Sequence, residues 1–263
     1  MCRMFGFCAA RPAAVVRSLI DEPNALKVQS HDHPDGWGIG YYPQDAEAPM
    51  VVRSLNSAFA DREFAEAAGR VTARTVIAHV RRASCGPVTL ENTHPFHHRR
   101  WLFAHNGTVS RFPDVRGALE AEIDGDLRGD LRGDTDSERC FLLILTRLRA
   151  HHPLDRGASV DAMAQSVRNV ADLVHRLADA GAPEPSSLTF ILSDGVSLVA
   201  YRDGRSLHYA VDALAGRLAS ELMVASEVLS AERTWAEVPP GGLVGVDESR
   251  ALHRHFPAAR LSA

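Results

Sequence analysis

The chain opens with MCRMFGFCAA (residues 1–10), which places a thiol directly behind the initiator methionine and follows it with an apolar run. The run from Met4 to Ala10 predicts a buried β-strand. Cys2 has three interpretations: an incidental residue on a frayed terminus, a small buried hydrophobe, or the true N-terminus after removal of Met1. Position alone favours the first two, so the rest of the chain has to decide.

Composition predicts a globular protein and excludes several functional classes. Of 263 residues, 45% are hydrophobic and 24% are charged, which is ordinary for such a chain. The formal net charge of −4 argues against a dedicated nucleic-acid or membrane-surface binder. Neither a secretory signal nor an apolar stretch of about 20 residues is present. We therefore expect a cytoplasmic protein with no nucleic-acid or membrane partner.

The cysteine and histidine patterns indicate no metal centre. The four cysteines contain no C-x-x-C pair, and a chain of this kind is expected to keep them reduced. Of the 13 histidines, seven lie in loop clusters at 31–33, 94–98 and 151–152, and none forms an H-E-x-x-H pair. We therefore predict no metal ion and no cofactor.

The order of expected elements predicts an α+β fold. Strands come first, two long helices lie in the middle, and strands return with Asp-Gly turns that are typical of a meander. No clear linker interrupts the pattern, so residues 1–263 are expected to form a single domain. Expected strands cover 2–10, 36–42, 50–55, 75–81, 101–105, 187–195, 197–204, 206–211, 222–229 and 241–246; expected helices cover 13–22, 60–71, 114–123, 135–152 and 159–181.

Between two of these strands lies a long irregular segment, residues 82–100, preceded by an arginine at a buried strand end. Long loops in compact domains are often functional. The fork of donors on Arg81 suits a carboxylate, but a lone arginine also commonly caps backbone carbonyls. The segment "GDLRGDLRGD" (125–134) is interpreted as a solvated loop.

Two further motifs have both a structural and a chemical interpretation. Asn106-Gly107 is either a turn or a two-donor oxyanion hole, with glycine allowing a carbonyl to approach closely. Asp136, in "TDSE", is either a helix cap, a role that Thr135 could also fill, or a carboxylate that holds a substrate ammonium group. A free N-terminal cysteine would supply a thiol nucleophile and an α-amine of pKa about 8 as its base.

Taken together, Cys2, "AHVRRASCG" (78–86), "NTHPF" (92–96), "AHNG" (104–107) and "TDSE" (135–138) occur in the order seen in class II glutamine amidotransferases, and the chain resembles this family of N-terminal-nucleophile hydrolases. The resemblance implies a four-layer αββα sandwich with two mainly antiparallel sheets. It implies that Cys2 is the nucleophile, that Asn106 and Gly107 are the oxyanion pair, and that Arg81, Ser84, Gly86 and Asp136 bind the substrate. His94 and His105 match histidines that we expect to be structural supports.

Two departures separate this chain from the biosynthetic members. Asp32 stands where many members have an arginine, and Arg82 where sugar-phosphate amidotransferases carry tryptophan. "DGWG" with "ENTHPF" and "TDSE" resembles the standalone branch, which includes γ-glutamyl hydrolases of ergothioneine synthesis and a fungal subunit for glutathione degradation. The length leaves no room for a synthase domain.

The sequence therefore predicts hydrolysis of the γ-amide of glutamine or of a γ-glutamyl compound through a thioester on Cys2. One alternative is a γ-glutamyl hydrolase for a thiol conjugate or peptide. Another is a non-catalytic binding module of the same fold. A separate synthase or amine-accepting chain is a possible partner, and the residues do not identify the leaving group.

Overall fold

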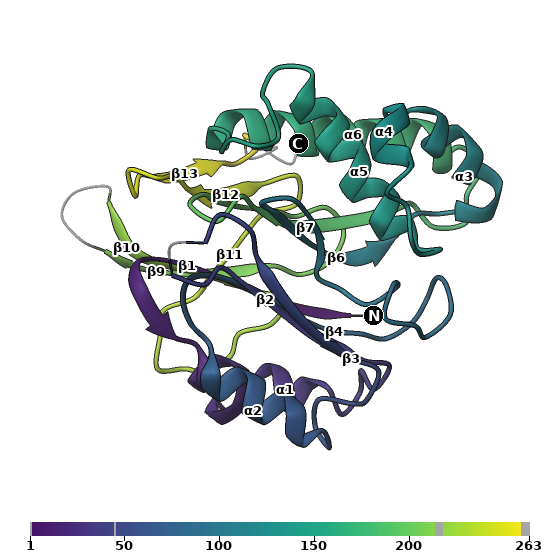
Figure 1. The fold of residues 1–263 in the computed structure, drawn as a ribbon. Helices are drawn as coiled ribbons and strands as arrows, with labels where there is room; N and C mark the ends of the chain where they lie inside the picture. Colours follow the sequence, from purple (N-terminus) through teal and green to yellow (C-terminus); the bar gives the residue numbers. More distant parts are fainter. Residues whose placement is uncertain (1, 45, 214–217, 259–263) are drawn as a thin grey trace, which may run out of the picture.

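The computed structural model describes residues 2–44, 46–213 and 218–258, in which two β-sheets lie face to face between two layers of helices (Figure 1). Every strand pair in this part of the chain is antiparallel. The predicted α+β class and the αββα sandwich with two antiparallel sheets are thus confirmed. No helix among these residues is long and apolar enough to cross a bilayer.

Within the described residues, the strands form one seven-stranded and one six-stranded sheet. In spatial order, the first contains β11 (Ala236–Glu237), β9 (His208–Ala213), β10 (Ala219–Ala225), β1 (Arg3–Ala14), β4 (Thr72–Val80), β2 (Trp37–Tyr41) and β3 (Met50–Ser54). The second contains β13 (Leu252–His255), β12 (Leu243–Val246), β8 (Leu198–Tyr201), β7 (Ser187–Ser193), β6 (Trp101–Thr108) and β5 (Phe96–His98).

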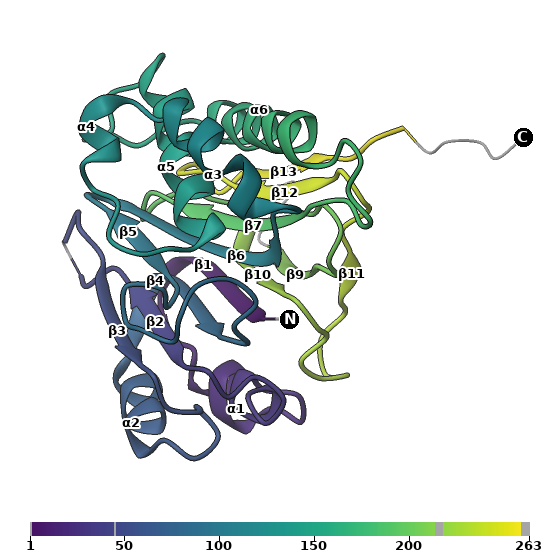
Figure 2. The same cartoon turned by 90° about the vertical axis from the view of Figure 1, so that its right-hand side faces the viewer.

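The helices divide between the two outer faces (Figure 2). On the seven-stranded sheet lie a π-helical turn (Arg17–Asp21), α1 (Leu26–Gln29) and α2 (Arg62–Arg70). On the six-stranded sheet lie α3 (Phe112–Ala121), α4 (Gly125–Arg128), α5 (Asp136–Arg149) and α6 (Val160–Ala178). Each interface between layers has its own apolar cluster, as a layered sandwich requires.

Strand β1 explains why the sequence begins as it does. Met4 and Cys8 contribute to the core between the sheets, whereas Phe5 and Phe7 contribute to the core under the helices. Side chains of a strand alternate between faces, so an apolar run is what a strand buried on both faces needs. Because β1 pairs with β10 on one side and β4 on the other, Cys2 precedes a central strand.

The predicted meander over 187–211 is wrong in its last strand. β7 and β8 pair as expected, but β9 pairs with β10 and β11 in the other sheet. The free edge of β8 is taken by β12, through register pairs such as Leu243 with Tyr201. Alternation of apolar residues predicts a strand but does not tell which sheet it joins.

Three local predictions also need correction. No α-helix spans the expected range 13–22. Strand β1 runs to Ala14, and a π-helical turn covers Arg17–Asp21. The expected solvated loop over 125–134 begins with α4, whose Leu127 is buried in the core. Asn106-Gly107 is not a turn, because β6 continues through it to Thr108 and pairs with β7 throughout.

Candidate active site

Cys2 lies half-buried just before β1, against the segment that follows β4. Its Sγ lies 3.4 Å from the amide nitrogen of Arg82 and 3.5 Å from the carbonyl oxygen of the same residue. Burial raises the pKa of the thiol, while the Arg82 amide and the charge of Arg81 oppose that rise. Arg3 donates to the Cys2 carbonyl at 3.1 Å and pairs with Glu227 at 3.2 Å. The Cys2 carbonyl is therefore held by Arg3, and Arg3 is in turn held by Glu227.

The predicted oxyanion pair lies in β6. A Cβ on Gly107 would lie 1.8 Å from the carbonyl oxygen of Ser187 on β7, so this position accepts only glycine. Asn106 is buried, and its Nδ2 donates to Ser226 Oγ at 3.3 Å. Its Oδ1 has no partner among the described residues. The amide nitrogen carries two N–H groups, so one is engaged by Ser226 and the second is not accounted for by that contact.

Arg81 is buried at the end of β4 and bonds to its own loop. The guanidinium donates to the carbonyl oxygens of Cys85, Gly86 and Pro87 at 3.0, 3.2 and 3.0 Å. Burial lowers its pKa, and the negative charges that act against this include those of Cys2 and Asp35. Carbonyl capping is the structural alternative of the sequence analysis; binding of a substrate carboxylate stays a prediction.

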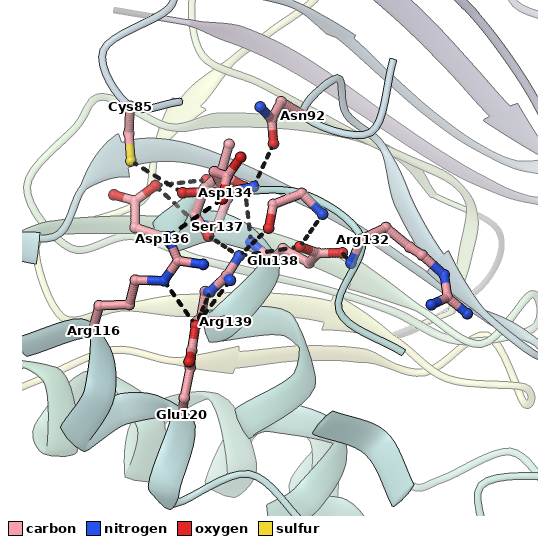
Figure 3. A network of polar contacts seen from close by, with 12 residues as sticks. Cys85, Asn92, Arg116, Glu120, Arg132, Asp134, Asp136, Ser137, Glu138 and Arg139 are labelled. Carbon is pink, nitrogen blue, oxygen red and sulfur yellow. Dashed lines mark hydrogen bonds and ion pairs between the residues drawn. The ribbon is translucent and has the colours of Figure 1, made fainter. Parts of the chain in front are cut away.

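The loop after Arg81 is tied to β6 and to α5. Ser84 Oγ lies 3.2 Å from Thr108 Oγ1. Gly86 has φ +72°, which favours glycine, and a Cβ there would approach the Asn92 amide at 3.0 Å. Asn92 Oδ1 in turn accepts from the amide of Asp134, just ahead of α5, at 2.7 Å (Figure 3). Ser84 and Gly86 therefore shape the loop that Arg81 holds.

Asp136 is the first residue of α5, and Thr135 is the cap, since its side chain accepts from the Glu138 amide. The Asp136 carboxylate is buried, with Oδ2 accepting from the Val109 amide at 2.7 Å and Oδ1 from the Ser137 amide at 2.8 Å. Its charge raises the pKa of Cys2. No basic side chain within 2–44, 46–213 and 218–258 forms an ion pair with it. Among the residues that the structure describes, this buried carboxylate therefore has no ion-pair partner.

Sequence comparison identifies the family of the chain. Residues 1–216 match the family model described as glutamine amidotransferases class-II. The chain belongs to this family.

Relatives of the chain have names that agree with the assignment. A probable glutamine amidotransferase, DUG3, of Saccharomyces cerevisiae is 27% identical over 96% of this chain and 83% of its own length. A γ-glutamyl-hercynylcysteine sulfoxide hydrolase of Mycobacterium tuberculosis is 28% identical over 94% of both chains. Membership places the chain among amidotransferases and hydrolases, which are enzymes.

Solved structures agree at the level of the fold. A glutamine aminotransferase class-II domain protein from Silicibacter pomeroyi is 24% identical, with a TM-score of 0.67 over 97% of this chain and 100% of that chain. The glutamine PRPP amidotransferase of Bacillus subtilis is 18% identical, with a TM-score of 0.65 over 98% of this chain and 50% of that one. These likenesses place the two sheets in the class II amidotransferase fold.

One residue of this candidate site could not be identified from the sequence. Ser226, buried directly after β10, has an Oγ that accepts from the Met4 amide at 3.1 Å and from Asn106 Nδ2. The Ser226 amide donates to the Met4 carbonyl at 3.0 Å. The hydroxyl thus joins the nucleophile strand to the oxyanion candidate. Nothing in the sequence signals it, because it depends on the pairing of β1 with β10.

A second group missed from sequence lies beneath Asp136 (Figure 3). Arg139, 2% exposed, donates from Nε and Nη2 to Glu120 Oε1 at 2.9 Å and from Nη1 to the Gly133 carbonyl at 2.6 Å. Glu138 accepts from the amides of Arg132 and Gly133 at 2.9 Å. Together they clamp the segment that leads into α5. The available signal was a pair of charged residues in the first turn of α5, directly before its apolar stretch.

The histidines at the site are held as neutral rings. His105 contacts Ser137 Oγ at 2.9 Å and the Ser187 carbonyl at 3.0 Å, and burial lowers its pKa. His94 stacks on His79 with ring centroids 4.3 Å apart. Burial lowers the pKa of both, that of His79 to about 3. At neutral pH these rings carry no charge, which fits supports better than acids.

The two departures from the biosynthetic members lie on the surface near the loop that follows Arg81. Asp32 is exposed. The nearby Asp35 contacts the loop after Arg81, because its carboxylate accepts a hydrogen bond from the Ala83 amide at 2.8 Å. Arg82 is exposed next to Cys2. Asp35 therefore joins the turn before β2 to the loop that carries Arg82.

Proposed function

We propose that this protein hydrolyses the γ-amide of glutamine or of a γ-glutamyl compound and releases glutamate with ammonia or an amine. The observation that carries the proposal is the position of Cys2. Its thiol precedes a central strand and contacts the segment after Arg81, and the same strand is joined to Asn106 by Ser226. A nucleophile and an oxyanion donor are thus held by one hydrogen-bonded chain.

Activation of the thiol requires removal of Met1, which lies outside the described residues. The freed α-amine, with a pKa of about 8, accepts the thiol proton. The need for a base follows from the pKa of the Cys2 thiol, which burial raises. Without a neighbouring base, a buried thiol is a weak nucleophile at neutral pH.

The substrate head group would be bound by the buried charges at Asp136 and Arg81. A buried carboxylate without a cation is costly, and a substrate ammonium group would provide that cation. Arg81 would bind the α-carboxylate by turning donors away from the loop carbonyls that it now caps. Ser84 and Gly86 keep this loop in place.

The reaction then follows two acyl-transfer steps. The thiolate attacks the γ-carbonyl carbon, and the tetrahedral oxyanion is stabilised by Asn106 and the backbone at Gly107. In comparable sites one such donor contributes about 3–4 kcal/mol. The leaving amine takes the proton from the α-ammonium, and a γ-glutamyl thioester remains. Water cleaves it, which releases glutamate and restores the thiol.

A second candidate is a γ-glutamyl hydrolase for a larger conjugate, in ergothioneine-type or glutathione-type metabolism. The relatives that favour it are the mycobacterial sulfoxide hydrolases, which align over 94% of this chain and 94% of their own length. A third candidate is a binding module that keeps the fold but catalyses no reaction, so that Cys2 would not act as a nucleophile. A separate synthase or amine-accepting chain is compatible with either enzymatic function.

We further propose that residues 1–263 act as one catalytic domain in the cytoplasm and that the reaction needs no cofactor. The family match and the relatives' coverage support one domain. All four cysteines are free thiols, which suits a reducing compartment.

A panel of γ-glutamyl substrates tests these functions against one another. Glutamate release is measured with glutamine, a γ-glutamyl peptide and a γ-glutamyl thiol conjugate. Release from glutamine alone supports the glutaminase, and a strong preference for a conjugate supports the second candidate. No release from any member by protein that begins at Cys2 would contradict both and support the binding module.

A further inference from the structure

Outside the proposed active site, two histidines and an aspartate meet at the edge of the six-stranded sheet. One ligand atom from each of Asp161, His253 and His255 lies within 4.8 Å of the others. Asp161 lies in the first turn of α6, and the histidines lie in β13, the edge strand beside that helix (Figures 1 and 2). Arg168 of α6 also donates to the His255 carbonyl at 3.3 Å.

The strand geometry directs both imidazoles to the same side. His253 and His255 are two residues apart, so they share a face of β13, whereas Arg254 points to the opposite face. The contacts agree, because Arg254 bonds to the Tyr209 hydroxyl of the other sheet at 3.0 Å. His255 Nε2 lies 3.3 Å from Asp161 Oδ1 on the helix side.

A fourth residue holds one of the rings from behind. Asp247 Oδ2 lies 2.7 Å from His253 Nε2. Asp247 is itself fixed, since its Oδ1 accepts from Ser249 Oγ at 2.7 Å and from the Ala251 amide at 2.9 Å. A carboxylate on one ring nitrogen keeps the proton there and leaves Nδ1 as a lone-pair donor, an arrangement found behind many metal-ligating histidines.

We propose that Asp161, His253 and His255 form a site for a divalent transition-metal ion of the zinc class. Two imidazoles and a carboxylate suit such ions. With bonds of about 2.0–2.2 Å, tetrahedral ligand atoms lie roughly 3.4 Å apart. The pair formed by His255 and Asp161 already has this spacing. His253 has a ligand atom within 4.8 Å of both and would have to move closer when the ion binds. A fourth position stays open to water.

Binding here would join α6 to β13. The sheet edge, held to the helix by few contacts such as that of Arg168, would gain a three-point attachment. A ligand that binds only the folded state stabilises it, so the ion should raise the melting temperature. This cluster was not identified from the sequence, because Asp161 is far from the two histidines along the chain.

Zinc titration of the purified full chain tests the site by calorimetry, with melting temperature as a second readout. Wild-type protein should bind one more equivalent of zinc than His253→Ala and than His255→Ala, and zinc should raise its melting temperature but not theirs. His98→Ala is the matched control, because His98 lies in the opposite edge strand beside one carboxylate, Asp130, at 3.2 Å. It should behave as wild type.

Far-UV circular dichroism checks that each variant folds. If a histidine variant does not fold, Asp161→Asn replaces it in the test, because Asp161 lies on a helix surface. Equal zinc stoichiometry and affinity in wild type and in the folded site variants would overturn the proposal, and so would absence of zinc binding in all of them. Neither readout uses γ-glutamyl hydrolysis, so the outcome is independent of the proposed function.

Discussion

At the scale of single residues, the Cys2 thiol and the Asn106 amide belong to different sheets, and one hydroxyl joins them. Ser226 Oγ accepts from the Met4 amide and from Asn106 Nδ2, so it fixes the amide relative to the strand behind the nucleophile. Oxyanion donors stabilise a transition state only when aimed at the developing charge. Ser226 is therefore a positioning residue in this account.

Replacing this hydroxyl should lower kcat more than it raises KM. For Ser226→Ala we expect a loss of about tenfold in kcat, less than the 10²–10³ seen when an oxyanion donor itself is removed. Ser220→Ala is the control, since Ser220 lies on the same β10 strand but bonds to the Asp212 carbonyl. Steady-state kinetics on folded protein decides, and an unchanged kcat in Ser226→Ala would contradict the role.

The buried charge of Asp136, for which the described part of the chain offers no ion-pair partner, should act mainly on substrate capture. Asp136→Asn keeps the shape and removes the charge, and a lost buried ion pair of about 2 kcal/mol corresponds to roughly a 30-fold rise in KM. Asp134→Asn, two residues away and exposed, should leave KM unchanged. A fall in kcat with an unaltered KM would show that the carboxylate does not hold the ammonium group.

The candidate residues of the site could be named from the sequence because five motifs occur in family order, and their catalytic and binding roles stay predictions. Ser226 could not be named, since its contacts depend on which strand lies beside β1. For Arg81 the sequence left two roles open, binding of a carboxylate and capping of loop carbonyls, which is the commoner role of a lone arginine. The structure places its donors on the carbonyls of Cys85, Gly86 and Pro87.

At the scale of elements, buried ionic and hydrogen-bonded contacts hold the start of α5, where Asp136 lies. Arg139 bonds to Glu120 of α3 and to the Gly133 carbonyl ahead of α5. Removing one member of a buried network leaves the others charged and unpaired, which costs about 3–5 kcal/mol. These contacts therefore determine how firmly the start of the helix is held.

The Arg139→Met variant should have a free energy of unfolding that is lower than that of wild type by about 3 kcal/mol or more. Urea denaturation measures this difference. Arg116→Met is the matched control, because Arg116 pairs with the same Glu120 but is 41% exposed. It should cost less than about 1 kcal/mol. Equal losses in the two variants would argue against a special role for the buried arginine.

A histidine of α6 makes stability depend on pH. His175 lies between Asp203 and Asp179, at 2.6 Å from each, and the hydrogen bond with Asp203 is the main reason that its pKa rises to about 9. Since the folded pKa lies above the ordinary value of about 6.5, the stabilisation is complete below pH 6.5. It is lost as pH rises towards 9.

Between pH 6.5 and 9, the melting temperature of wild type should therefore fall more steeply than that of His175→Gln. Thermal unfolding in matched buffers measures both profiles. His151→Gln, on an exposed loop, should follow wild type. Parallel pH profiles for wild type and His175→Gln would show that the two aspartates do not stabilise the charged ring.

At the scale of the whole molecule, the sequence predicted the class of fold but not how the chain moves between sheets. Strand–helix–strand order and the family resemblance implied two sheets between helices. The return of β9 to the first sheet, where it pairs with β10, could not be predicted, because the alternation in 206–211 fits either sheet. This crossing places Ser226 beside β1.

The central claim is that Cys2, as the first residue of the mature chain, forms a γ-glutamyl thioester. Mass spectrometry of protein quenched in acid during turnover of the preferred γ-glutamyl substrate tests it most directly. The account predicts an N-terminal peptide that begins at Cys2 and carries a γ-glutamyl adduct, absent in Cys2→Ala, which should have no turnover. Normal hydrolysis by Cys2→Ala, or by protein that retains Met1, would contradict it.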